Sequence, residues 1–246
     1  MSSPEDQSAN RDTAAQQDRL IDAMTQALAS VAEPGETGLH LRRIASYVQA
    51  LARQLCLSES YATRWPEAVR ADIVRACVLH DIGNSAVPDR ILLKPGALTT
   101  DELDTVRSHA TVGRDFLAQL QRNFGEPSPF LDIARQIAYS HHERWDGKGY
   151  PQGLAGDAIP APALLTAVAD SYDALTSDRV YRAGIAHDKA IQQLFQERGA
   201  QLAPEMVDAL IEVEHEFADI AKRFADSEHD LQRRIDYLAK AIAENP

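Results

Sequence analysis

The chain of 246 residues lacks several features that would mark a secreted or membrane protein. Its only two cysteines, Cys56 and Cys77, lie in apolar, helical stretches, which predicts buried reduced thiols instead of a disulfide framework. No uninterrupted apolar run approaches the roughly 18 residues that a membrane span needs. The polar first residues contain no apolar signal-peptide core. We therefore expect a cytoplasmic protein without a membrane span.

Excess positive charge and strand patterns are also missing. The net charge of -12 argues against a surface that binds DNA or RNA. It leaves room for a small anionic nucleotide, because bound metal ions can reverse the sign of the charge locally. No segment alternates with period two, whereas apolar residues recur at helical spacing along most of the chain. We therefore predict an all-α fold.

The distribution of polar and apolar residues divides the chain into three parts. Residues 1–34 read as a polar tail and one helix, and residues 35–204 as the main domain. Residues 205–246 read as a C-terminal helical extension, because the helical pattern continues from Pro204 to about Glu244. This long C-terminal helix packs on its own domain or pairs with a second copy as a coiled coil. Further helices are expected near 39–55, 65–80, 99–120, 130–142, 162–176 and 186–198.

Side chains that can bind metal ions recur at the ends and on the apolar faces of these helices. Adjacent His141 and His142 are costly to bury without a purpose, and imidazole is the commonest protein ligand for transition metals. Asp170 follows an apolar run, where a carboxylate needs a partner or a cation. Glu36 and His40 are four residues apart and share one helix face. The candidate ligands are Glu36, His40, His80, Asp81, His109, His141, His142 and Asp170.

This set is too large for one ion, so two or three ions that share bridging carboxylates fit it better. Mixed imidazole and carboxylate ligands suit iron, manganese or zinc more than calcium. Adjacent residues of a regular helix point about 100° apart. His80 and Asp81 can therefore reach one centre only where their helix ends or is distorted, and we expect Gly83 to stop it. Such a centre can generate hydroxide and clamp phosphoryl oxygens.

Three segments together resemble the HD-GYP family, a branch of the HD-domain metal-dependent phosphohydrolases. They are the His80-Asp81 pair, the loop HHERWDGKGYP at 141–151 and the run VADSYDALTSDRVYR at 168–182. The resemblance extends from about residue 36 to residue 204. It implies an all-helical bundle around two or three divalent ions, often iron or manganese. It also implies hydrolysis of the bacterial second messenger cyclic di-GMP to pGpG, and in some members on to GMP.

The resemblance also assigns roles to single residues. It implies that Asp81 bridges the ions and that Glu36 and His40 are the extra ligand pair of three-metal members. The implied core ligands are His80, Asp81, His109, His141, His142 and Asp170. The implied substrate contacts are Tyr150, Arg179 and Arg182. Asp173 also falls in the matched run, where a carboxylate that orients Arg179 or the nearby backbone is an equally good interpretation.

One position departs from the family pattern, which usually reads His-Asp-Ile-Gly-Lys. Here Asn84 replaces the lysine that is expected to face the scissile phosphate. Asparagine donates hydrogen bonds but brings no positive charge, and removal of one such charge-stabilising donor commonly costs on the order of a hundredfold in rate. Lys94, Lys148 or a third ion could supply the missing charge.

These observations leave three hypotheses. The first is a phosphodiesterase that acts on cyclic di-GMP. The second is a catalytically weak module that binds cyclic di-GMP or docks a partner, and the resemblance implies a diguanylate cyclase domain at the loop of residues 143–160. The third is a hydrolase for another cyclic dinucleotide or nucleotide. Because about 35 residues precede Glu36, we expect no receiver or other sensory domain before the site.

Overall fold

The computed structural model describes residues 19, 21–32, 38–94, 96–178 and 183–244. Across these ranges the secondary structure is helical, and strand-like pairing is limited to an isolated bridge between Arg198 and Leu202. The all-α prediction is therefore confirmed. In the same ranges, no helix combines the length and the apolar character needed to cross a membrane.

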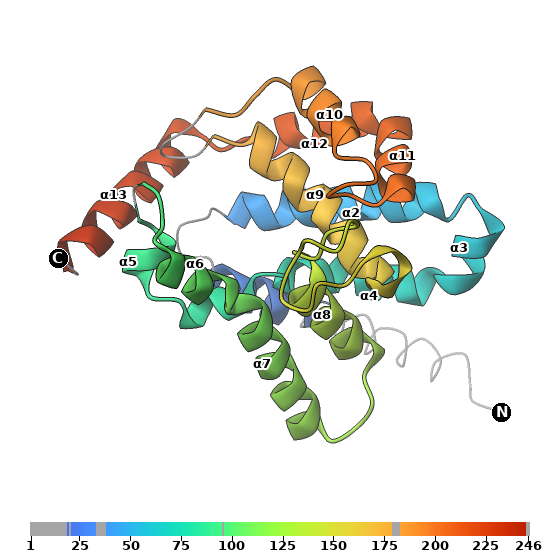
Figure 1. Cartoon of the computed structure of the whole chain (residues 1–246), viewed down its shortest axis with the longest axis horizontal. Helices are drawn as coiled ribbons and strands as arrows, with labels where there is room; N and C mark the ends of the chain where they lie inside the picture. The colour runs from blue at the N-terminus through green and yellow to red at the C-terminus, as the bar shows by residue number, and fades with distance from the viewer. Residues whose placement is uncertain (1–18, 20, 33–37, 95, 179–182, 245–246) are drawn as a thin grey trace, which may run out of the picture.

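Two long helices, α2 (Gly38–Leu55) and α9 (Ala161–Thr176), pack against each other in the middle of the molecule. On one side lie α10 (His187–Gln196), α11 (Pro204–Glu212) and α12 (Glu214–Arg223). On the other lie α4 (Glu67–Ala76), α7 (His109–Phe124) and α8 (Pro129–Ser140) (Figure 1). Smaller elements are α3 (Glu59–Arg64), α5 (Asp89–Leu92), α6 (Thr100–Arg107) and the 3-10 turn η3 (Gly156–Ala158).

Aromatic packing joins α2 to α9 and α12. The Tyr47 ring of α2 stacks on Phe217 of α12 with ring centroids 4.4 Å apart, and it meets Tyr172 of α9 edge-on at 5.2 Å. All three rings are fully buried. Burial of such large side chains stabilises the fold most where they interlock. This cluster therefore fixes α2 and α9, which carry His40 and Asp170, relative to each other.

The helix expected over 65–80 ends earlier than predicted. After α4 the chain tightens into the 3-10 turn η1 (Cys77–Leu79) and, past His80 and Asp81, into a second 3-10 turn, η2 (Ile82–Ala86). Gly83 is therefore not the helix stop. A Cβ atom at Gly83 would lie 2.0 Å from the His109 carbonyl oxygen, so glycine is needed for the close approach of η2 to α7. The expected distortion at His80-Asp81 is present.

The helix expected over 99–120 is two helices. Thr99 caps α6 through a capping box with Glu102, but α6 ends at Arg107 and α7 begins at His109. His109 is consequently the first residue of α7 and not an interior residue of one helix over 99–120, as the sequence predicted. The break turns the His109 side chain into the protein, where it is buried.

The continuous helix expected from Pro204 to Glu244 is divided into α11, α12 and α13 (Glu228–Glu244). Leu210, Phe217 and Ile220 are buried in the chain's own core, so a single coiled coil along this span is excluded. α13 leaves the bundle and lies beside α5 (Figure 1), where the Tyr237 hydroxyl donates a 2.8 Å hydrogen bond to Asp89. The division into 1–34, 35–204 and 205–246 stays a prediction.

The close approach at Gly83 gives a stability prediction. We expect Gly83→Ala to lower the free energy of unfolding by about 3 kcal/mol, because the added methyl group forces the first turn of α7 outward. Gly38→Ala is the control: nothing lies within 4 Å of a Cβ atom there, and the expected change is within about 1 kcal/mol. Denaturant midpoints measure both, and equal midpoints would contradict the assigned role of Gly83.

Candidate metal centre

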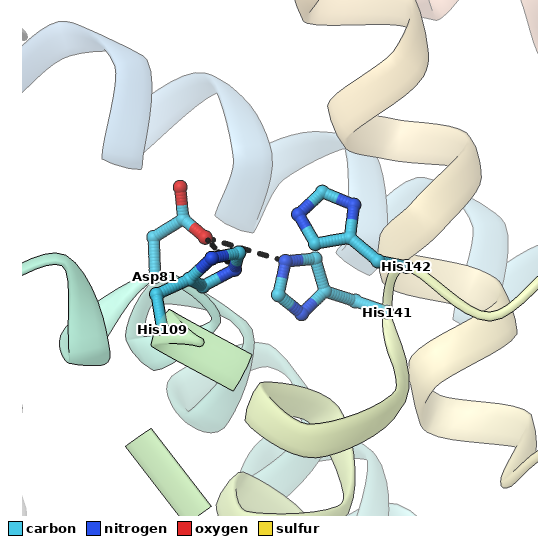
Figure 2. Close-up of side chains that lie close together, drawn as sticks. All are labelled: Asp81, His109, His141 and His142. Atoms are coloured by element: carbon cyan, nitrogen blue, oxygen red, sulfur yellow. Dashed lines mark ion pairs between the residues drawn. The ribbon is translucent and has the colours of Figure 1, made fainter. Parts of the chain in front are cut away.

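Four candidate ligands from three segments converge on one point. Asp81 lies in the turn between η1 and η2, His109 begins α7, and His141 and His142 follow the last residue of α8. One ligand atom from each lies within 4.8 Å of the others. Figure 2 shows Asp81 facing His109 and His141, with His142 beside them. Each of the three segments brings its side chain inward because a helix begins or ends there.

The atoms that face one another in this cluster have the character of metal ligands. Asp81 Oδ1 lies 3.2 Å from His109 Nε2 and 3.3 Å from His141 Nε2. All three atoms are buried and lack a well-directed hydrogen-bond partner among the described residues. Buried polar atoms normally have partners, and a cation at this point would satisfy all three. The donor set therefore fits a divalent ion.

Three histidines are held in one tautomer by the backbone. The Nδ1 atoms of His80, His109 and His141 lie 2.9, 2.6 and 3.0 Å from carbonyl oxygens three or four residues earlier. A ring nitrogen that donates to a carbonyl fixes the ring and leaves the other nitrogen as the ligand atom. The Nε2 atoms are therefore the ones available to ions at this centre.

A second group adjoins the first. It consists of His40 from α2, His80 and Asp170 from α9, and one ligand atom from each lies within 4.8 Å of the others. The His80 Nε2 atom lies 3.8 Å from Asp81 Oδ2, so the two oxygens of Asp81 face different groups. A carboxylate in this position can bridge two ions. Glu36, the other residue of the expected third-ion pair, lies outside the described residues.

The charges within the centre favour the metal-binding forms of Asp81 and His142, whereas the Asp81 carboxylate raises the pKa of the buried His109. Burial alone would raise the pKa of Asp81, but the surrounding imidazoles of His80, His109 and His141 hold it well below its usual range. Burial and the neighbouring His141 lower the pKa of His142 well below its usual value. A carboxylate and a neutral imidazole are the forms that coordinate metal ions.

Asp173 binds two residues of α2, while Arg179, its expected partner, lies outside the described residues. Its Oδ2 lies 2.7 Å from His40 Nδ1, and its Oδ1 accepts a hydrogen bond of 2.5 Å from Arg43 Nε. Burial would raise the pKa of this carboxyl, but the hydrogen bonds from His40 and Arg43 lower it to about 2. Sequence reasoning missed Arg43 altogether. The spacing of Asp170 and Asp173, one helical turn apart, was the available signal.

The loop 143–156 is organised by Glu143, another residue that sequence reasoning passed over. The buried Glu143 carboxylate accepts hydrogen bonds from the backbone N–H groups of Gln152 at 2.7 Å and Leu154 at 3.0 Å. Gly149 packs so closely that a Cβ atom there would lie 2.4 Å from Arg144 N. The loop thereby returns to the centre, and Tyr150 N donates to the His142 carbonyl at 3.2 Å.

Tyr150, one of the expected substrate contacts, lies against His142 of the candidate ligand group. Its ring stacks on His142 with centroids 4.8 Å apart, and the Arg107 guanidinium lies over the Tyr150 ring at 5.3 Å. Burial and the nearby Asp81 carboxylate raise the pKa of the Tyr150 hydroxyl, which keeps it a hydrogen-bond donor at neutral pH. Arg179 and Arg182, the other two expected substrate contacts, lie outside the described residues.

Asn84 lies in the centre, next to Asp81. Its Nδ2 atom donates a 3.0 Å hydrogen bond to Asp81 Oδ2, while its Oδ1 atom is buried without a hydrogen-bond partner among the described residues. Both lysines considered as substitute cations lie beside carboxylates. The Lys94 ammonium binds both oxygens of Glu102, and Lys148 is 79% exposed with its Nζ 3.6 Å from Asp146. Among the described residues, Arg107 is a cation that contacts Tyr150.

The architecture and this constellation agree with a comparison against protein families. Residues 9–206 match the model of the HD domain. The chain belongs to the HD domain family. The resemblance to its HD-GYP branch, carried by His80-Asp81 and the loop HHERWDGKGYP, is also confirmed by the relatives that the chain matches. In this fold the bundle places several helix ends, with their candidate ligands, around one point.

Curated relatives and solved structures extend the comparison. A "Probable cyclic di-GMP phosphodiesterase" of Vibrio cholerae serotype O1 is 45% identical over 213 residues, which cover 86% of this chain and 48% of the relative. A "3'3'-cGAMP-specific phosphodiesterase 2" of the same organism is 36% identical over 192 residues, covering 78% and 34%. The chain therefore spans about half or less of the length of these relatives. The crystal structure of the V. cholerae cyclic GMP-AMP phosphodiesterase V-cGAP3 shares the fold, with a TM-score of 0.55, 17% identity and coverage of 90% and 60%.

Proposed function

We propose that this chain is a metal-dependent phosphodiesterase that hydrolyses cyclic di-GMP to pGpG, with further cleavage to GMP as a possible second step. The observation that carries the proposal is the bridging position of Asp81, with Oδ1 toward His109 and His141 and Oδ2 toward His80. The similarity to a cyclic di-GMP phosphodiesterase supports the substrate. Two or three divalent ions, iron or manganese, would occupy the centre.

The proposed ligands divide into two groups. One ion would be held by Asp81, His109, His141 and His142, and a second by His40, His80 and Asp170, with Asp81 between them. Glu36 would complete a third position. Bound ions would supply Lewis acidity toward the phosphoryl oxygens and lower the pKa of water.

The chain's own residues would then orient the substrate. Asn84 holds Asp81 through its amide N–H and turns its remaining donor capacity toward the phosphate. The Tyr150 hydroxyl donates a hydrogen bond at the loop, and its ring offers a surface for stacking. Arg179 and Arg182 would hold phosphates as planar, always-charged forks. Each of these roles places charge or hydrogen-bond donors where phosphoryl charge develops.

Arg107 is proposed as an additional substrate contact. Its side chain is 48% exposed, and its ion pair with Asp104 at 3.8 Å lies at the surface, where such pairs contribute little. We expect Arg107→Gln to raise KM for cyclic di-GMP about tenfold with unchanged metal content, because one charged hydrogen-bond donor to a phosphate is lost. Arg114→Gln, which removes the guanidinium over Tyr139, is the matched control. An unchanged KM in Arg107→Gln would remove Arg107 from the site.

A related substrate is the first alternative, because one relative is named for specificity toward 3'3'-cGAMP. Metal-loaded protein should be assayed in parallel with cyclic di-GMP, 3'3'-cGAMP and nucleoside triphosphates. The proposal predicts the highest kcat/KM for cyclic di-GMP. Faster cleavage of 3'3'-cGAMP would reassign the substrate, and no cleavage of any of them would reject the hydrolase.

A binding module is the second alternative, and Asn84 is the observation that favours it. In that case the centre would hold metal ions and cyclic di-GMP with little turnover, and the loop of residues 143–160 would dock a diguanylate cyclase domain. A homodimer through α13 is a further prediction, supported by the exposure of Ile235 on that helix. Equilibrium binding of cyclic di-GMP without product formation is the result that would favour the module.

A further inference from the structure

The second ligand group is backed by a buried network that reaches the C-terminal helices. His40 and Arg43 lie one turn apart on α2, and Asp170 and Asp173 lie one turn apart on α9. Residues at this spacing share a helix face. His40 and Asp170 point to the centre, whereas Arg43 and Asp173 form the layer behind them. The two helices therefore meet through one ligand pair and one ion pair.

Both carboxylate oxygens of Asp173 are engaged by His40 and Arg43. Its Oδ1 accepts from Arg43 Nε, and its Oδ2 faces both His40 Nδ1 at 2.7 Å and Arg43 Nη2 at 3.1 Å. A carboxylate on Nδ1 fixes the imidazole tautomer and directs Nε2 toward an ion. His40 is thus oriented by a side chain, whereas His80, His109 and His141 are oriented by backbone carbonyls.

Arg43 also binds residues in the turn between α12 and α13. Its Nη1 donates to the Phe224 carbonyl at 2.8 Å and lies 3.5 Å from Asp226 Oδ2. The side chains of Arg43, Asp173 and Asp226 are 3 to 5% exposed. Asp226 also lies 3.9 Å from Arg234 Nη1 on α13. One planar guanidinium therefore binds Asp173 along one edge and the turn between α12 and α13 along the other.

We propose that Arg43 and Asp173 are positioning residues for the His40 ion, and that Arg43 couples this ion to the turn between α12 and α13. This rests on the proposed metal centre. It predicts that the two ligand groups respond differently to changes in the network. In the group of Asp81, His109, His141 and His142, backbone carbonyls hold His109 and His141, so this group should not depend on Arg43.

Metal binding alone tests the coupling. The chain of residues 1–246, stripped of metal with a chelator, is titrated with Mn²⁺. Calorimetry or electron paramagnetic resonance measures the number and affinity of the sites, and the thermal midpoint is recorded alongside. In Arg43→Gln we expect one site to weaken about 10- to 100-fold while the other stays within about twofold. In a His109→Gln background, which disrupts the other group, the remaining site should be the one that Arg43→Gln weakens.

Arg53→Gln is the matched control. Arg53 also lies on α2 and binds Glu216 of α12, but both side chains are exposed and neither contacts Asp173. It should leave both sites unchanged. Asp226→Asn removes the charge on the outer edge of Arg43 and should weaken the same site by a smaller factor. Arg43→Lys retains the charge without the fork, and it should weaken that site more than Asp226→Asn does.

Two results would overturn the inference: unchanged affinities in Arg43→Gln and Asp226→Asn, or equal loss at both sites in step with the thermal midpoint. Should Arg43→Gln fail to fold, Asp226→Asn and Arg43→Lys decide by the same criteria. Hydrolysis of cyclic di-GMP is measured separately. Suppose that the wild-type protein binds two Mn²⁺ ions, that the Arg43 and Asp226 variants change the site affinities as expected, and that no cyclic di-GMP is cleaved. This result would reject the proposed function and leave this inference standing.

Discussion

Asp81→Asn is expected to bind at least one ion fewer per chain and to hydrolyse cyclic di-GMP at least about a hundredfold more slowly. The reason is the position of the two carboxylate oxygens. One faces His109 and His141 at 3.2 and 3.3 Å, and the other faces His80 at 3.8 Å. The amide keeps the shape of the side chain but loses the charge and one acceptor. Elemental analysis and a product assay on the same sample measure the two effects.

The control for Asp81→Asn is Asp157→Asn, which changes an exposed carboxylate in η3. It should match the wild type in metal content and rate. The double substitution His80→Ala and Asp81→Ala should abolish both properties. Wild-type activity in that double variant would show that the reaction takes place elsewhere, whatever its metal content.

Asn84→Lys is expected to increase turnover of cyclic di-GMP by up to about a hundredfold, because it restores a positive charge beside the scissile phosphate. Asn84 is 8% exposed and its amide contacts Asp81, so the new ammonium would begin next to the centre. Single-turnover rates at saturating substrate measure the effect. They separate a faster chemical step from tighter binding.

Asn84→Gln is the control, since it lengthens the side chain without adding charge. It should not exceed the wild-type rate. A large gain in Asn84→Lys from a barely active wild type would favour the binding module as the natural role. Equal rates in all three proteins would mean that another group, such as Arg107 or a further ion, already supplies the charge.

The candidate ligands that the structure brings together could be named from the sequence because their chemistry is local. His141-His142, His80-Asp81 and Asp170 stand out as polar groups in apolar surroundings, and burial of such groups needs a compensating partner. The distortion at His80 and Asp81 could be predicted because adjacent residues of a regular helix point about 100° apart. Both side chains can therefore reach one centre only where the helix ends or is distorted. These inferences need only the neighbouring residues.

The supporting contacts could not be found in this way, because they join distant segments. Arg43 and Asp173 are 130 residues apart, and only the packing of α2 on α9 brings them together. The division of the helices at Ser108 and Val213 also escaped prediction, since neither glycine nor proline marks these positions. Tertiary packing overrides local helical propensity there.

The most direct test of the account is the metal content of the wild-type protein, purified anaerobically and assayed with cyclic di-GMP in the same preparation. The account predicts at least two ions of iron or manganese per chain and hydrolysis that is lost on chelation and restored by adding the metal back. One ion or none per chain, or hydrolysis that survives complete metal removal, would contradict it.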